Sequence, residues 1–242
     1  MARCSPAVYV CVSKCCKKLG SPATHDLFRA FAPDGVEVEE SGCHGQCGSG
    51  PNLVASGTLY TGVYKPATAA AILEKECGAA VPAALITAYK EKMRGDQDLR
   101  DGRYAKSLTQ IDAALASGHL DAFPEALCSA WLSRSEALHR QAAAATDAAA
   151  RAELLGGAAA AARAAARAAP ARRAAWLRLC DALDAAGAVA EALESLQEME
   201  AALAEGGEQQ QRRSSGGGGG RDAVVAKKAE RLRAKLEQLS SA

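Results

Sequence analysis

The sequence predicts a small α/β unit over residues 6–80, followed by an all-α region over residues 83–205. Two observations lead to this fold class. Short runs of β-branched and aromatic residues, bounded by Gly, Pro and Ser, lie before residue 65 and are typical of strands. Beyond residue 83 the chain is rich in alanine, a strong helix former, and its apolar residues recur at helical spacing.

The α/β unit is expected to run strand, helix, strand, strand, strand, helix. The segment Ala7–Val12 predicts a buried strand by its β-branched and aromatic content. Ser21 and Pro22 predict the cap and the first residue of a helix. Ser56-Gly57 predicts the turn of a hairpin. The other expected elements are strands over 36–40, 52–55 and 59–63 and a helix over 67–76, and the first helix is expected to end before Pro33.

Residues 83–205 are expected to be helical almost throughout, with turns at Gly102 and Gly187. A further helix is expected to start at Pro124, and an alanine tract over 142–169 follows it. Three cysteines occupy apolar positions of predicted helices, and we expect them in the core: Cys77, Cys128 and Cys180.

The C-terminal part of the chain changes in composition. Residues 206–221, GGEQQQRRSSGGGGGR, predict a flexible linker because they offer almost nothing for a core. Residues 222–240 predict one more helix, and its apolar stripe consists of Val225, Leu232, Leu236 and Leu239.

The overall charge gives no reason to expect a nucleic acid or a membrane as partner. The chain has 29 Lys and Arg against 28 Asp and Glu, and only 4% of its residues are aromatic. Arginines, among them Arg151, Arg163 and Arg167, interrupt the alanine tract, so we expect no transmembrane helix.

Four of the nine cysteines form two close pairs. Cys11 and Cys16 follow a C-x4-C spacing, and Cys43 and Cys47 follow C-x3-C. Two such pairs brought together make a four-thiolate cage, which suits an iron–sulfur cluster or a tetrahedral metal. Structural zinc and two redox disulfides are the alternatives, and Cys15 is available in place of Cys16.

Residues 7–78 resemble the thioredoxin-like [2Fe–2S] ferredoxins and the related small cluster-bearing subunit of NADH dehydrogenases and hydrogenases. The resemblance rests on C-x4-C followed by Lys17-Lys18-x-Gly20-Ser21, and on Gly42-Cys43-x-Gly45-x-Cys47-x-x-Gly50-Pro51. It implies a thioredoxin-like fold with a [2Fe–2S] cluster, whose ligands would be Cys11, Cys16, Cys43 and Cys47. Cys16 is preferred to Cys15 because the basic residues and Gly-Ser follow it at the family's spacing. His44 stands where the family has no ligand.

The helical region carries a second resemblance. The segment Trp176–Leu203 is similar to a tetratricopeptide repeat at Trp176, Leu179, Cys180, Leu183, Gly187, Ala192 and Leu196. This implies an all-α, tetratricopeptide-like helical domain that binds other proteins. A plain helical bundle is the alternative.

These features together predict an electron-transfer protein that docks to a larger, multisubunit complex through its helical region. The alternatives are a scaffold or assembly factor, in which the cluster domain is structural or redox-sensing, and a redox-regulated thiol protein. We expect no enzymatic activity, because no phosphate-binding loop and no catalytic set of side chains stands out. The resemblance to cluster domains with appended helices in plastids implies the chloroplast stroma, with the cytoplasm as the alternative.

Overall fold

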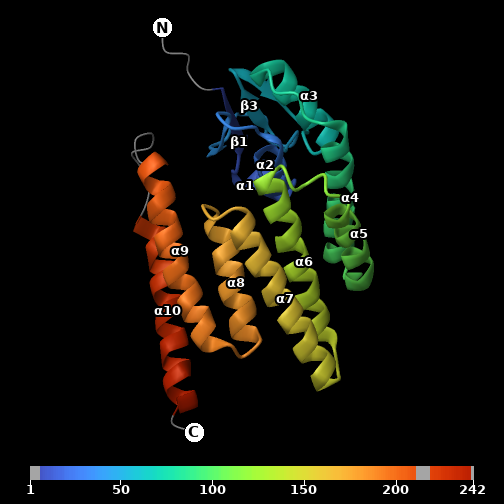
Figure 1. Ribbon diagram of the computed structural model, residues 1–242. Coiled ribbons are helices and arrows are strands. Elements are labelled where there is room, and N and C mark those ends of the chain that lie inside the picture. The colour runs from blue at the N-terminus through green and yellow to red at the C-terminus, as the bar shows by residue number, and fades with distance from the viewer. Residues whose placement is uncertain (1–5, 211–218, 241–242) are drawn as a thin grey trace. The chain divides into compact units, whose positions relative to one another are not determined.

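The computed structural model describes residues 6–210 and 219–240 (Figure 1). The chain divides into two compact units. The first contains the residues up to Arg94 together with Asp112–Ser129, and the second contains Gly95–Ile111 together with the residues from Ala130 onward. A small mixed sheet lies near the N-terminus and the rest is mainly helical, which confirms an α/β unit followed by a helical region.

The four strands of the sheet lie in the order β2-β1-β3-β4. Their bounds are Ala7–Cys11 for β1, Glu37–Ser41 for β2, Leu53–Ala55 for β3 and Thr58–Tyr60 for β4. Strand β1 runs parallel to β2 and antiparallel to β3, which forms a hairpin with β4. The predicted two-residue turn joins β3 to β4, and both of its residues have positive φ, 48° at Ser56 and 84° at Gly57.

Helices cover one face of this sheet. Val8, Val10 and Leu53 are fully buried on that face, whereas Tyr9, which points the other way, is 41% exposed. Helix α2 (Ser21–Phe31) contacts β1 and β2, and helix α3 (Pro66–Cys77) contacts α2 and β3. The apolar face expected of the first helix is the buried one, and its residues are Leu27, Phe28 and Phe31.

Local details of the α/β unit differ from the sequence-based expectation, and one is that the strand expected over 59–63 ends at Tyr60. The loop expected around the first cysteine pair contains a short helix, α1 (Lys14–Lys18). The N-cap of α2 is Gly20 and not Ser21, because Gly20 adopts a left-handed conformation with φ of 94° and turns the chain one residue earlier. Ser21 is therefore the first residue of the helix, and its side chain is buried.

The helical part of the chain follows the expected order. Its helices are α4 (Ala83–Arg100), α5 (Tyr104–Ala116), α6 (Pro124–Ala144), α7 (Ala148–Ala168), α8 (Arg173–Ala185), α9 (Val189–Gln210) and α10 (Gly219–Ser240). The predicted turns at Gly102 and Gly187 are present, with φ of 76° and 83°. Within the second unit α8 packs against both α7 and α9, and α9 packs against α10, as Figure 1 shows.

The predicted linker over 206–221 is shorter than expected. Helix α9 continues to Gln210 and α10 begins at Gly219. Residues 211–218, the centre of the predicted linker, lie outside the described residues.

Two of the three cysteines expected in the core are buried. Cys128 and Cys180 have less than 2% of their surface exposed, and burial raises the pKa of Cys180 to about 11. Cys77 is only half-buried, which corrects that expectation, because it is the last residue of α3 and stands next to the left-handed Gly78.

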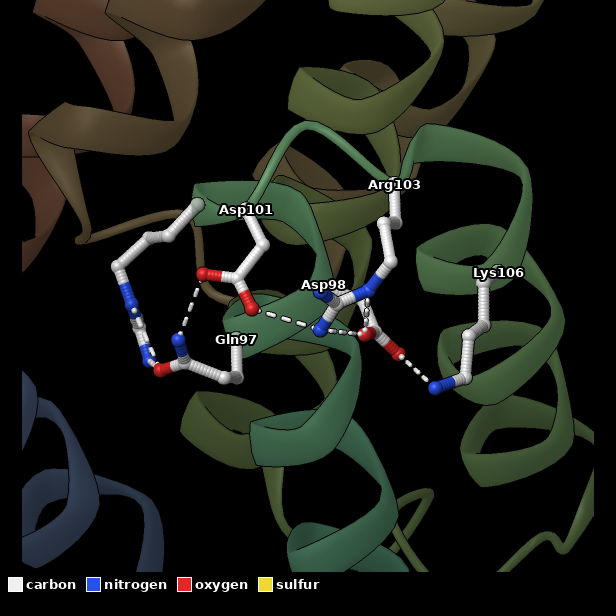
Figure 2. Close-up of polar contacts among 6 residues, drawn as sticks. Gln97, Asp98, Asp101, Arg103 and Lys106 are labelled. Atoms are coloured by element: carbon white, nitrogen blue, oxygen red, sulfur yellow. Dashed lines mark hydrogen bonds and ion pairs between the residues drawn. The ribbon is translucent and has the colours of Figure 1, made fainter.

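The turn between α4 and α5 is held by a network of ion pairs (Figure 2). The carboxylate of Asp98 is 4% exposed and accepts a hydrogen bond of 2.7 Å from Nε of Arg103, while Nζ of Lys106 lies 3.5 Å away. Burial alone would raise the pKa of Asp98, but Arg103 and Lys106 hold it below its ordinary value. Arg103 also pairs with Asp101 at 2.6 Å, so the network fixes the turn.

Candidate metal centre

The fold carries both cysteine pairs to one edge of the sheet. Cys11 is the last residue of β1, and it lies in register with Ser41, the last residue of β2. Cys16 follows in α1, and Cys43 and Cys47 follow in the loop after β2. Because β1 and β2 are adjacent and parallel, their C-terminal ends meet at the same edge, and so do the cysteines that follow them.

The second pair has the spacing of two ligands on one metal. Sγ of Cys43 lies 3.5 Å from Sγ of Cys47. A tetrahedral metal with metal–sulfur bonds of about 2.3 Å holds two thiolates about 3.7 Å apart. Little movement of these side chains is therefore needed for both to bind one metal ion.

The first pair and the second pair are close enough to influence each other's ionisation. Cys11 and Cys16 each shift the pKa of the other, and the charge of Cys43 raises the pKa of Cys16. Cys15, which the sequence offered only as a substitute, contributes to the raised pKa of Cys47. The four predicted ligands and Cys15 thus lie toward the same end of the sheet.

The cysteines lie as pairs and do not close around a single point. Among the described residues, no group of three or more Cys, His, Asp or Glu side chains is arranged to hold one metal ion. A [2Fe–2S] cluster bound by four cysteines takes two thiolates on each iron. The pairwise arrangement fits that division, with Cys11 and Cys16 as one pair and Cys43 and Cys47 as the other.

Backbone groups influence the sulfur atoms of both pairs. The amide of Gly45 donates to Sγ of Cys43 at 3.4 Å. On the other pair, the backbone of Ser13 and of His44 lowers the pKa of Cys11, and that of Asn52 acts in the same direction on the pKa of Cys16. Such donors stabilise the thiolate form, and at an iron–sulfur cluster they raise the reduction potential.

The thiols of each pair differ in acidity. Burial alone would raise the pKa of Cys11, but hydrogen bonds from Ser13, Cys16 and His44 bring it below its ordinary value. Burial and the contact with Cys11 raise the pKa of Cys16. In the other pair, the hydrogen bond with Cys43 and the nearby Cys15 raise the pKa of Cys47 to about 11. Binding of a metal by these pairs therefore has to displace protons.

The two pairs also differ in exposure. Cys11 and Cys16 are 0% and 3% exposed, whereas Cys43 and Cys47 are exposed, as is Cys15. The site thus has a buried side and a side that faces solvent.

Glycines determine how closely the loop approaches the sulfur atoms. A Cβ at Gly50 would lie 2.9 Å from Sγ of Cys16, closer than such atoms normally come. Gly45 and Gly48 have φ of 83° and 97°, which few other residues adopt. Gly42 has no such constraint, since no atom lies within 4 Å of the position of its Cβ.

His44 is engaged elsewhere. Its Nε2 lies 2.8 Å from Oγ of Ser41, so the imidazole is hydrogen-bonded to the end of β2. Its backbone, not its side chain, contacts Cys11. The roles of Ser13, Asn52 and the His44 amide carry no signal in the sequence, because every residue other than proline has a backbone N–H.

The chain was compared with protein families, curated proteins and solved structures. No family model, no curated protein and no solved structure matches the chain. Within residues 6–210 and 219–240, none of the helices has the length and apolar character that crossing a membrane demands.

Proposed function

We propose that the chain is an electron-transfer protein that holds a [2Fe–2S] cluster through Cys11, Cys16, Cys43 and Cys47. The observation that carries this proposal is the meeting of two thiol pairs at one edge of the sheet, one pair buried and one exposed. Such a cluster, when bound, accepts and returns one electron.

The surrounding residues have separate tasks in this proposal. The buried pair, Cys11 and Cys16, anchors the site, since its sulfur atoms are shielded from water. The exposed pair, Cys43 and Cys47, brings the site to the surface, which shortens the path to a redox partner. The amide of Gly45 and the backbone of Asn52 stabilise the charge on the sulfur atoms.

The topology of the sheet supports a thioredoxin-like fold for the first unit. The order β2-β1-β3-β4, with β1 parallel to β2 and antiparallel to β3, is what a β-α-β segment followed by a β-hairpin and a helix produces. Strand β1 then occupies the interior of the sheet, and its end bears Cys11.

We propose that the helical region docks the protein to a larger complex as a tetratricopeptide-like domain. Six of the seven positions that resemble the repeat are buried in α8 and α9, and Gly187 turns the chain between those helices. Successive helices from α7 to α10 pack on one another, as they do in a solenoid.

An assembly factor remains the second candidate, and the extent of the helical region favours it. Helices α4–α10 begin at Ala83 and occupy most of the described chain. In that case the cluster would be structural or redox-sensing, and alterations of the helical surface would impair the protein most.

The experiment that tests electron transfer is a redox titration of the anaerobically purified protein, followed by electron paramagnetic resonance. A carrier predicts reversible one-electron reduction, with about one unpaired spin per cluster in the reduced state. A cluster that cannot be reduced reversibly would refute electron transfer and favour the assembly factor. Disulfides in a colourless protein would refute the cluster itself.

A further inference from the structure

We propose that the exposed side of the cysteine site docks an acidic protein surface. The docking surface consists of Lys14, Lys17 and Lys18 in α1, the neighbouring Leu19, and the exposed cysteine loop over 42–49. This inference rests on the proposed function, because it names the kind of redox partner that the site would meet.

The charge around the site is of one sign. In residues 6–25 and 41–64, Lys14, Lys17 and Lys18 are the only Lys, Arg, Asp or Glu residues. The nearest carboxylates of the adjoining strand, Glu39 and Glu40, lie in register with Tyr9 and Val10, before the strand end that bears Cys11. The Lys, Arg, Asp and Glu side chains that border the thiols are therefore all positive, although the whole chain is nearly neutral.

The lysines and the exposed thiols belong to one continuous surface. Helix α1 carries both the lysines and the exposed Cys15. Leu19 adjoins the same loop, since a Cβ at Gly50 would lie 3.3 Å from Cδ1 of Leu19. The lysines are exposed, and Leu19 is 45% exposed.

None of the three lysines forms an ion pair with another described residue. Many other cations of the described chain do have a carboxylate partner, as Arg29 has in Glu125 at 2.6 Å and Arg178 in Glu136 at 2.7 Å. Unpaired lysines around an exposed redox site attract an oppositely charged surface and accelerate its encounter. Leu19 supplies apolar contact once the surfaces meet.

The charge pattern favours an acidic protein over a nucleic acid. Three lysines make a small patch, and the proposed docking surface contains no Phe, Tyr or Trp side chain on which bases could stack. An acidic protein surface with its own redox group would be attracted by these lysines. It would then lie close enough to Cys43 and Cys47 to exchange an electron with the site.

The test measures how fast inorganic oxidants take an electron from the reduced holoprotein. Hexacyanoferrate(III) is the anionic probe, and tris(phenanthroline)cobalt(III) is the cationic probe, both mixed in a stopped-flow instrument. We expect the rate with the anionic probe to fall by about 10-fold as ionic strength rises from about 0.02 to about 0.5 M, and the rate with the cationic probe to rise.

Two double variants make the test specific. Lys17→Glu with Lys18→Glu should abolish or reverse the salt dependence with hexacyanoferrate(III). Lys65→Glu with Lys90→Glu is the matched control, because both lysines are exposed and lie outside the docking surface. The control should stay within about 2-fold of the unmodified protein at each ionic strength.

A competitor then identifies the class of partner. Polyglutamate should slow the reaction with hexacyanoferrate(III) in the unmodified protein and in the control, but not in the Lys17/Lys18 variant.

Three outcomes would contradict these expectations. If polyuridylate slows the reaction more than polyglutamate does, the choice of a protein partner is overturned. A salt dependence of the same sign and size in the Lys17/Lys18 variant would overturn the docking surface. A protein without a reducible visible band before mixing would instead refute the proposed function.

Discussion

At the scale of single residues, the site combines a buried anchor with an exposed edge. Cys11 and Cys16 are shielded and have opposite shifts in pKa, whereas Cys43 and Cys47 lie at the surface, 3.5 Å apart at their sulfur atoms. The cysteine spacing in the sequence predicts both pairs. The effect of Cys15 on the pKa of Cys47 was not predictable, because it depends on how α1 lies against a loop some thirty residues away.

Cys43→Ser tests the exposed pair. The change removes one thiolate and the sulfur that accepts from Gly45 at 3.4 Å, so the cluster should be lost or bind more weakly. Iron content and visible absorption per chain measure this. Cys77→Ser is the control, since Cys77 lies at the end of α3 outside the site, and it should retain the full absorption. Equal losses in both variants would contradict the assignment of ligands.

Gly50→Ala tests the close approach of the loop to the buried pair. Its Cβ would lie 2.9 Å from Sγ of Cys16, so we expect an overpacking cost of about 1–3 kcal/mol and faster loss of the cluster to a chelator. Gly42→Ala is the control, because its Cβ would meet no atom within 4 Å. Similar decay of visible absorption in the two variants would show that loop packing does not hold the site.

At the scale of elements, close helix packing explains two glycines that look alike in the sequence. Gly95 lies in α4 and Gly156 in α7, and both stand within helices. A Cβ at Gly95 would lie 2.6 Å from Cγ1 of Ile111 in α5, whereas a Cβ at Gly156 would have nothing within 4 Å. The sequence predicted both helices, but it could not reveal which glycine faces a neighbour.

Alanine at these two positions should therefore act in opposite directions. Gly95→Ala forces α4 and α5 apart, and we expect it to lower the free energy of unfolding by about 1–3 kcal/mol. Gly156→Ala should raise it by about 0.5–1 kcal/mol, because alanine favours the helix and meets no obstacle. Denaturant unfolding followed by circular dichroism measures both. A stabilising Gly95→Ala would contradict the packing described for α4 and α5.

Helix α10 forms ion pairs with α8 and packs against α9. Asp184 pairs with Arg231 at 2.8 Å and with Lys235 at 2.6 Å, and Leu232 between them is fully buried. The predicted apolar stripe of this helix is thus only partly buried, since Leu239 is 58% exposed. Sequence periodicity predicts the stripe, but it does not tell which of its residues are buried against neighbouring helices.

Leu232→Ala and Leu239→Ala test this attachment as a matched pair. The first creates a cavity in the second unit and should lower the free energy of unfolding by about 2–5 kcal/mol. The second removes exposed surface and should change it by less than about 0.5 kcal/mol. Thermal or denaturant unfolding distinguishes them. Two equally small effects would mean that α10 does not pack on the helical unit as described.

At the scale of the whole molecule, composition and periodicity predicted an α/β unit followed by helices, and the structure agrees. The division into compact units differs from a simple cut after residue 80, because residues 112–129 belong with the first unit and residues 95–111 with the second. Local patterns identify elements, but they carry no information on which distant helices pack together.

The proposed electron-transfer function requires that the two thiol pairs hold two irons and two sulfides. The direct measurement is iron and acid-labile sulfide per chain in protein that is purified anaerobically from iron-supplied cells and shown to be folded. We predict about two irons and about two sulfides per chain. A folded, colourless chain that contains neither iron nor sulfide, even after reconstitution with both, would contradict it, as would a single zinc ion held by the same cysteines.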